Sequence, residues 1–273
     1  MVGVIGVGII GGGIARALAR AGWQILVLDH HPEKVAPFGE GAIAASAADL
    51  ARRSDVVIVS VFSEQQVRDV FTADDGLLHG ARPGLAIVTV STVGTRLIED
   101  LRVLAERAGV TLLDGGVTGG RDSAREGRLV VMIGGPADSV ERVRPVLDAF
   151  STLVVHVGPA GAGIRAKLAR QLITYSAYYA TACASEIATR AGVDLDALAK
   201  AIRQSDEQTG GPATQQLARR TASLETREHQ AAACHKDIGA ARDLAASLGI
   251  ELPLADLVLA SVDDIYRVGA RHD

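Results

Sequence analysis

A glycine-rich turn near the start of the chain constrains its fold more than any other feature. An apolar run, Val2–Val7, leads into the sequence Gly6-Val7-Gly8-Ile9-Ile10-Gly11, and an amphipathic segment, Ile9–Ala21, follows. In such a turn the first glycine permits a tight bend, the second lets a pyrophosphate approach the backbone, and the third allows the helix to pack on the strand. The N-terminus of the helix favours the negative charge of phosphates. The pattern therefore predicts a strand, a dinucleotide-binding turn and a helix.

A carboxylate follows at the position where this type of turn requires one. Asp29 ends the second predicted strand, Gln24–Asp29, 18 residues beyond Gly11 (29 minus 11). A carboxylate there can accept hydrogen bonds from the ribose hydroxyls of adenosine and repels a 2′-phosphate. No arginine follows, since the next residues are His30, His31 and Pro32. The sequence favours NAD over NADP, with His30 or Lys34 left as groups that could tolerate the phosphate.

The first half of the chain alternates between apolar runs and amphipathic segments. The expected strands are Val2–Val7, Gln24–Asp29, Asp55–Val61, Leu85–Val90, Thr111–Asp114, Leu129–Ile133 and Thr152–Val157. The expected helices between them are Ile9–Ala21, Ser63–Phe71, Gly94–Ala108 and Ala137–Ala149. Alternation of this kind predicts an α/β fold, an N-terminal Rossmann-type domain with a doubly wound, mostly parallel sheet.

The second half of the chain is expected to be all-α. Helical patterns run from Ile164 to Arg190, after an N-cap at Asp194, and over Arg227–Leu248 and Pro253–Arg267, with a break at Gln208–Pro212. Two glycines, Gly161 and Gly163, precede the first of these helices. We therefore predict a dinucleotide-binding domain over residues 1–160 and a helical domain for substrate binding and dimerisation over residues 161–273.

Composition excludes several classes of function. The 273 residues are 48% hydrophobic and 22% charged, with a net charge of -4, and no basic stripe suggests a nucleic-acid partner. The longest uncharged stretch, Gln171–Ser185, is too short and too polar to span a membrane.

Two cysteines and the lack of a secretory signal indicate a cytoplasmic protein. The apolar helix around Tyr175–Tyr179 indicates a homo-oligomer, a dimer or a tetramer.

No metal site is expected. His229, Cys234 and His235 lack the spacing of a zinc site, and no acid completes the set. His30 and His31 adjoin Asp29, but in an extended chain their rings point to opposite sides.

Five short signatures occur in the order found in the β-hydroxyacid dehydrogenases, a family that includes 3-hydroxyisobutyrate dehydrogenase and tartronate semialdehyde reductase. They are Gly6–Gly11, Ser91-Thr92, Asp114–Gly120, Gly161–Lys167 and Lys236-Asp237. Together they span nearly the whole chain. The resemblance implies reversible oxidation of a small β-hydroxyacid to its semialdehyde, with a nicotinamide cofactor as the hydride acceptor.

The resemblance also assigns residues to the substrate and to catalysis. It implies that the Thr118 hydroxyl and the backbone N–H groups of Gly119 and Gly120 hold a substrate carboxylate, a role that suits a small nest of donors. It implies that Lys167 is the catalytic acid and base. A lysine close to the positive charge of an oxidised nicotinamide has its pKa lowered toward the working range.

Further residues are expected at the cofactor. By resemblance, Thr92 lies in a loop on the nicotinamide side and Lys236 reaches back toward the cofactor from a later helix. The alternative for Lys236 is an exposed face of charges. Val61 and Phe62 follow the third strand and are expected to border the cofactor.

Three positions depart from the family pattern. Gln171, four residues after Lys167, replaces an asparagine that helps to bind substrate, and its extra methylene shifts the amide. His229, seven residues before Lys236, replaces a phenylalanine that lies against the cofactor; a histidine satisfied by local hydrogen bonds is the alternative. Gly115-Gly116 replaces Ala-Pro. These changes leave the predicted fold and cofactor intact and leave the substrate open.

Two other functions remain open. Imine reductases resemble the same two-domain architecture, but they usually carry Asp or Tyr in place of the lysine and favour NADPH, so Lys167 and Asp29 argue against this alternative. A protein that binds the nucleotide without catalysis is the second, motivated by Gln171 and His229.

Overall fold

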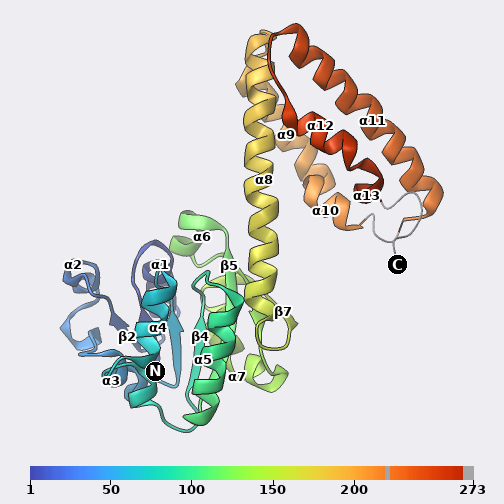
Figure 1. Cartoon of the computed structure of the whole chain (residues 1–273). Coiled ribbons are helices and arrows are strands. Elements are labelled where there is room, and N and C mark those ends of the chain that lie inside the picture. The colour runs from blue at the N-terminus through green and yellow to red at the C-terminus, as the bar shows by residue number, and fades with distance from the viewer. Residues whose placement is uncertain (219–221, 267–273) are drawn as a thin grey trace. The chain divides into compact units, whose positions relative to one another are not determined.

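The computed structural model of the chain describes residues 1–218 and 222–266 (Figure 1). The chain divides into two compact units, Met1–Gln171 and Leu172–Asp273. The first unit combines a β-sheet with helices, and the described part of the second unit is helical.

Within the described residues, the first unit contains one seven-stranded sheet with the order β2-β1-β3-β4-β5-β6-β7. Neighbouring strands are parallel except for β5 and β6, which are antiparallel. The predicted fold class, a mostly parallel Rossmann-type sheet followed by a helical region, is confirmed. The strands are β1 (Val2–Ile5), β2 (Ile25–Leu28), β3 (Val56–Val59), β4 (Ala86–Thr89), β5 (Thr111–Thr118), β6 (Leu129–Gly134) and β7 (Ser151–Gly158).

Helices cover both faces of this sheet, because the inner strands are apolar on both sides. Val4 and Ile5 on β1 belong to two separate buried clusters, as expected when successive side chains point to opposite faces. One cluster includes residues of α1 (Ile9–Arg20), α6 (Gly120–Glu126) and α7 (Ala137–Asp148). The other includes residues of α3 (Ala47–Arg53), α4 (Glu64–Thr72) and α5 (Thr95–Arg107).

The seven strands all differ from their expected ranges by at least one residue, and two of these differences have a clear cause. β1 ends at Ile5 because Gly6 adopts φ 84° and turns the chain. β5 continues beyond Asp114 to Thr118, because residues 114–118 pair with β6, from Asp114 opposite Gly134 to Thr118 opposite Val130. The helices α3 and α6 were not predicted at all. Strands β1 to β4 are mutually parallel, so the loops that follow them meet at one edge of the sheet, where ligands bind in such folds.

The described part of the second unit consists of helices, and two of the predicted helix boundaries are found there. The predicted N-cap Asp194 accepts hydrogen bonds from the N–H groups of Asp196 and Ala197, and Gly210 takes a left-handed conformation at the predicted break. The segment predicted as Pro253–Arg267 forms two helices, and Arg267 lies outside the described residues. Among described residues, no helix is both long and apolar enough to cross a membrane. The helices are α8 (Ala162–Arg190, which begins in the first unit), α9 (Leu195–Thr209), α10 (Gly211–Ala218), α11 (Leu224–Ser247), α12 (Pro253–Ala260) and α13 (Val262–Tyr266).

Candidate functional site

The glycine turn between β1 and α1 has the geometry that its sequence predicts. A Cβ atom on Gly6 would lie 2.5 Å from the carbonyl oxygen of Ser60, and one on Gly11 would lie 1.9 Å from the carbonyl oxygen of Gly6. Both positions therefore exclude a side chain. Gly8, the N-cap of α1, differs because a Cβ there would meet no atom within 4 Å. The open space beside Gly8 lies at the N-terminus of α1, and an anion fits there.

Two alanine substitutions separate the structural role of these glycines from a binding role. We expect Gly11→Ala to reduce stability and soluble yield, because its methyl group collides with backbone. We expect Gly8→Ala to keep a wild-type unfolding temperature and to weaken NADH binding at least tenfold, since its methyl group would enter the space in which the sequence predicts the pyrophosphate. Thermal unfolding and NADH fluorescence titration measure the two effects. Equal NADH affinity in Gly8→Ala and wild type would contradict this placement of the phosphates.

Asp29 lies directly after β2, and its side chain is only 5% exposed. Its Oδ2 accepts a hydrogen bond of 2.9 Å from the N–H of Val7 in the glycine turn, and its Oδ1 accepts one of 3.0 Å from the N–H of His31. The Nζ of Lys34 lies 3.7 Å from Oδ1. Each carboxylate oxygen has two lone pairs, so both oxygens can still accept a hydrogen bond from a ligand.

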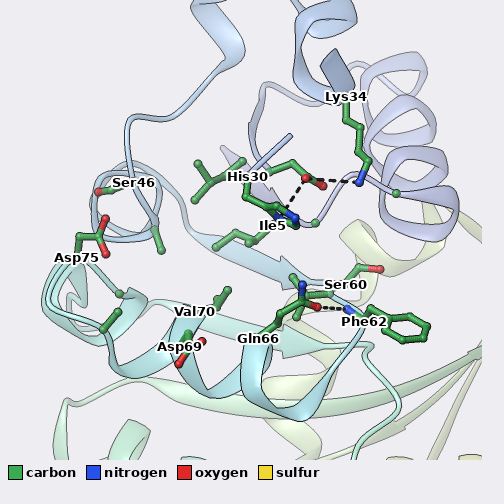
Figure 2. A pocket seen from close by; sticks show the side chains of 18 of the residues that line it. Ile5, His30, Lys34, Ser46, Ser60, Phe62, Gln66, Asp69, Val70 and Asp75 are labelled. Atoms are coloured by element: carbon green, nitrogen blue, oxygen red, sulfur yellow. Dashed lines mark hydrogen bonds and ion pairs between the residues drawn. The ribbon is translucent and has the colours of Figure 1, made fainter. Parts of the chain in front are cut away.

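A pocket of about 530 Å³ opens at this edge of the sheet (Figure 2). Six of the residues predicted to bind the cofactor line it: Gly6, Gly8, Asp29, His30, Val61 and Phe62. The remaining lining comes from β1, β2, α2 (Pro32–Val35), the segment around the start of α3, the end of β3, and α4 with the turn that follows it. These residues are Ile5, Leu28, Lys34, Ala45, Ser46, Ala47, Ser60, Gln66, Asp69, Val70, Ala73, Asp75 and Gly76.

Sequence reasoning missed most of that remaining lining. Gln66, Asp69 and Val70 recur at helical spacing on α4, the helix after β3, so periodicity could have found them. Ser46 is the N-cap of α3 and accepts a hydrogen bond of 3.1 Å from the N–H of Asp49. That helix was not predicted, so its contribution to the pocket could not be.

Hydrogen bonds tie the loops after β3 and β4 together. Ser91 Oγ donates to the carbonyl oxygen of Val61 over 2.8 Å, and Gly94 N–H donates to the carboxylate of Glu64. The N–H of Phe62 donates to Gln66 Oε1 over 3.0 Å, while the Phe62 ring is 95% exposed. The backbone beside the pocket is thus fixed, and an aromatic ring is left in solvent at its rim.

Lys167, on the first turns of α8, is half-buried against β5. Its Nζ donates a hydrogen bond of 2.8 Å to the carbonyl oxygen of Val117. Burial lowers the pKa of the Lys167 amine below its usual range, and the nearby charge of Arg170 lowers it further. Gly116 makes this approach possible, since a Cβ there would lie 2.6 Å from the Cβ of Lys167. The glycine that replaces the usual proline is therefore explained by the packing of α8.

Asp114, buried to 1% exposure on β5, holds the start of α8. Its Oδ1 accepts a hydrogen bond of 2.6 Å from the N–H of Gly161, and its Oδ2 accepts one of 2.7 Å from the N–H of Ile164. Burial raises the pKa of this carboxyl, and these two N–H groups act in the opposite direction. Asp114 caps the helix that carries Lys167. The sequence motif contained this residue, but no role was predicted for it.

The three residues predicted to bind the substrate carboxylate follow Val117. Thr118 ends β5, and Gly119 (φ 121°) and Gly120 (φ 74°) turn the chain into α6. Lys167 contacts Val117, the residue immediately before Thr118, so the predicted catalytic and substrate residues adjoin within the first unit. Gln171 lies one helical turn after Lys167 on α8 and is the last residue of that unit.

The remaining predicted residues are distributed as follows. Val7, Ile9 and Ile10 belong to the glycine turn and the start of α1, and Thr92 follows β4. His229 and Lys236 lie on α11 in the second unit, where the Nζ of Lys236 is 3.3 Å from Asp237 Oδ1. Their roles at the cofactor stay predictions.

Comparison with known proteins gives a consistent result over the whole chain. The NAD-binding domain of 6-phosphogluconate dehydrogenase matches residues 1–158, and the NAD-binding domain of NADP-dependent 3-hydroxyisobutyrate dehydrogenase matches residues 161–273. An uncharacterised oxidoreductase of Mycobacterium tuberculosis is 35% identical over 94% of this chain and 90% of its own length. The L-threonate dehydrogenase of Cupriavidus necator is 36% identical over 75% of this chain and 70% of its own length.

Solved structures share the same architecture. A crystal structure from Mycobacterium avium superimposes with a TM-score of 0.87 at 29% identity, covering 98% of this chain and 99% of the other. An imine reductase variant from Myxococcus stipitatus gives a TM-score of 0.77, covering 98% of this chain and 94% of the other. Its identity is 21%, so this second likeness concerns the fold alone.

Proposed function

The chain belongs to the β-hydroxyacid dehydrogenase family and is an NAD(P)-dependent oxidoreductase of the hydroxyacid dehydrogenase type, and within that family we propose that it oxidises a small β-hydroxyacid reversibly to its semialdehyde, with Lys167 as acid and base. The observation that carries this proposal is the half-buried Lys167 amine with its lowered pKa, next to the Thr118–Gly120 turn. A nicotinamide cofactor, when bound, supplies the hydride acceptor.

Lys167 has the properties that proton transfer requires. The neutral amine accepts the proton of the substrate hydroxyl during oxidation, and the ammonium returns it during reduction. Val117 orients the amine by accepting its hydrogen bond. Because burial and Arg170 both disfavour the charged form, a larger share of Lys167 is neutral near physiological pH than for an exposed lysine.

The substrate carboxylate is assigned to the turn after β5. The left-handed conformations of Gly119 and Gly120 bend the backbone there, so that N–H groups can converge on an anion beside the Thr118 hydroxyl. Gln171, on the helix that carries Lys167, is assigned to a polar group of the substrate. These four residues select a short hydroxyacid rather than a neutral alcohol.

We assign NAD as the preferred cofactor, held within the first unit by Gly6–Gly11, Asp29, His30, Val61, Phe62 and Thr92. Asp29 supports this preference, since a nearly buried carboxylate beside the glycine turn repels a 2′-phosphate. Lys34 at 3.7 Å offsets part of that charge, which leaves NADP as the weaker ligand rather than an excluded one.

Removing the charge of Asp29 tests the cofactor preference. We expect Asp29→Asn to raise KM for NAD about tenfold and to lower KM for NADP, because repulsion of the 2′-phosphate disappears while Lys34 stays. Steady-state kinetics with both cofactors measure the change, and Asp148→Asn, an exposed carboxylate outside the pocket, is the control. An unchanged ratio of the two KM values in Asp29→Asn would remove Asp29 from cofactor selection.

A substrate panel tests the reaction itself. NADH absorbance is followed with short β-hydroxyacids, their semialdehydes and cyclic imines. Turnover of hydroxyacids and semialdehydes is expected. Reduction of cyclic imines without carbonyl turnover would replace the proposal with imine reduction, and tight NADH binding without any turnover would indicate a nucleotide-binding protein that lacks catalysis.

We also propose a homodimer, with residues 1–160 binding the cofactor and residues 161–273 serving substrate binding and dimerisation. Among described residues, those buried in the second unit are small, whereas large apolar side chains of α8 are exposed, which favours burial against another copy. The buried residues are Ala188, Gly211, Ala231, Ala245, Ala255 and Val262, and the exposed ones are Leu168, Leu172, Ile173, Tyr175, Tyr178 and Tyr179.

Sedimentation velocity tests this assembly. We expect a species of at least twice the 28.3 kDa chain mass at micromolar concentration, and we expect Leu172→Arg to shift it toward the monomer, because a charge on an apolar interface is costly. The exposed Leu257→Arg on α12 serves as the control for an added charge. A wild-type monomer at this concentration would contradict the proposal.

A further inference from the structure

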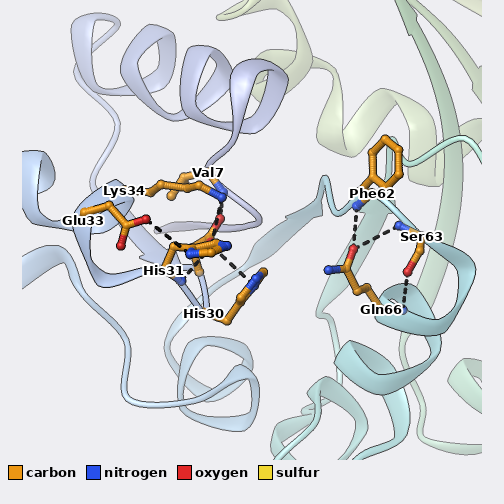
Figure 3. A network of polar contacts seen from close by, with 9 residues as sticks. Val7, His30, His31, Glu33, Lys34, Phe62, Ser63 and Gln66 are labelled. Atoms are coloured by element: carbon orange, nitrogen blue, oxygen red, sulfur yellow. Dashed lines mark hydrogen bonds and ion pairs between the residues drawn. The ribbon is translucent and has the colours of Figure 1, made fainter.

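Two histidines and an aspartate lie close together directly after β2, and two of the three, Asp29 and His30, line the pocket. Asp29, His30 and His31 each offer a ligand atom within 4.8 Å of the other two. The ring centroids of His30 and His31 are 4.1 Å apart, because the chain bends at His30 instead of continuing extended. The expectation that these rings point to opposite sides was therefore wrong. Figure 3 shows both labelled histidines beside Lys34 and Val7.

The chemistry of this cluster suits a divalent ion of borderline softness. Imidazole nitrogens favour zinc, copper, nickel and iron, whereas magnesium and calcium favour oxygen ligands. Two histidines and one carboxylate are a known zinc ligand set, with water in the fourth position. Ligand atoms around a tetrahedral zinc lie about 3.3 Å apart, since each is about 2.0 Å from the metal. Here the ligand atoms lie within 4.8 Å of one another, and rotation of the two exposed imidazole rings can bring them closer together.

Without a metal, the negative charge of Asp29 is balanced only by long contacts with basic side chains. Lys34 Nζ lies 3.7 Å from Asp29 Oδ1, and His30 Nδ1 lies 3.5 Å from the same oxygen. Neither contact is a short hydrogen bond. His31 Nδ1 lies 3.3 Å from Glu33 Oε1, which places a second carboxylate next to the cluster. A dication can therefore replace the ammonium of Lys34, whose long side chain is partly exposed and free to move away.

We propose that Asp29, His30 and His31 form a binding site for a zinc-like divalent ion, and that this site overlaps the position of the cofactor ribose. Asp29 and His30 also line the pocket. The Asp29 carboxylate cannot coordinate a metal and accept hydrogen bonds from the ribose hydroxyls equally well at the same time. The ion and the cofactor therefore compete for it. The metal site stands on geometry alone, whereas the competition rests on the proposed placement of the cofactor.

Zinc binding is tested on the full chain without cofactor. Calorimetric titration with zinc chloride in a non-chelating buffer is expected to give one site per chain with micromolar affinity. His31→Ala is expected to weaken that site about tenfold or more, because it removes one of three protein ligands. Lys34→Met is expected to strengthen it severalfold by removing a positive charge. His79→Ala, an exposed histidine outside the cluster, is expected to leave it unchanged.

Several results would overturn the metal site. They are equal zinc affinity in His31→Ala and wild type, weakening by His79→Ala to the same extent, or magnesium binding as tight as zinc. Thermal unfolding of each variant shows whether a loss of binding reflects misfolding; if His31→Ala unfolds early, His31→Gln replaces it.

Competition is tested separately by NADH fluorescence. Zinc at saturating concentration is expected to raise the apparent Kd for NADH at least tenfold in the wild type and much less in His31→Ala. If zinc binds through the histidines but leaves the NADH Kd unchanged, the overlap is overturned, and with it the placement of the ribose on Asp29. The calorimetric result for the metal itself would be unaffected, so the two failures are distinguishable.

Discussion

Lys167→Ala is expected to lower kcat about 100- to 10,000-fold, the usual contribution of a positioned acid and base. The Kd for NADH is expected to change little, because the assigned role of Lys167 is proton transfer and not cofactor binding. Stopped-flow or steady-state absorbance at 340 nm on the best substrate of the panel measures the first quantity, and fluorescence titration measures the second.

Two further variants sharpen this result. Lys167→Arg keeps a positive charge but cannot release a proton near neutral pH, so it is expected to be nearly as inactive as Lys167→Ala. Lys200→Ala removes an exposed lysine of α9 and is expected to retain wild-type turnover. Full activity in Lys167→Ala would refute the mechanism.

The pH profile gives a second signature of the same group. Oxidation needs the neutral amine, so its rate rises with pH through the pKa of Lys167 and is constant above it; reduction needs the ammonium and falls over the same range. Burial and Arg170 place this transition below the pH of an ordinary lysine. Arg170→Gln removes one of these influences, so the transition is expected to move to higher pH. A transition that stays in place would assign the lowered pKa to burial alone.

Asp114→Ala is expected to reduce the free energy of unfolding by about 3 kcal/mol, the largest effect on stability that we predict. Hydrogen bonds to a charged acceptor contribute about 1.5–3 kcal/mol each, and the substitution leaves the buried N–H groups of Gly161 and Ile164 without their acceptor. For a chain of this size, that corresponds to a fall of about 10 °C in Tm. Differential scanning calorimetry measures it.

The control for this prediction is Asp148→Ala, which removes an exposed carboxylate at the end of α7 and is expected to change Tm by about 1 °C or less. Asp114→Ala is also expected to reduce turnover in material that remains folded, because α8 carries Lys167 and loses its cap. A Tm within 2 °C of wild type would mean that water replaces the carboxylate, and that Asp114 does not fix the helix.

Local sequence patterns were sufficient to predict the elements that depend only on residues close by in the chain. The glycine turn, the strands of the parallel sheet and the N-cap at Asp194 depend on backbone sterics, β-branched runs and a short capping bond. Elements whose environment comes from distant residues were misjudged. Residues 115–118 extend β5 only because β6 lies alongside, and α6 forms after a glycine turn that no apolar periodicity marks.

The same distinction applies to the candidate site: its residues could be found from the sequence, but the contacts between distant residues could not. Spacing and resemblance identified Asp29, Lys167 and Thr118–Gly120, because the functional residues of each motif lie close together in the sequence. Spacing could not reveal that Val117 accepts the hydrogen bond of Lys167, that Asp114 caps α8, or that His30 and His31 converge on Asp29.

The sequence by itself determined the fold class and the nucleotide-binding turn, since both follow from glycine sterics and apolar periodicity, and its resemblance to the β-hydroxyacid dehydrogenases indicated the type of oxidoreductase. Only the tertiary structure decided the environment of those residues. Val117 and Lys167 are 50 positions apart in the chain, as are Asp114 and Ile164. Burial, and with it the lowered pKa of Lys167, arises from packing between such distant segments, which no local pattern encodes.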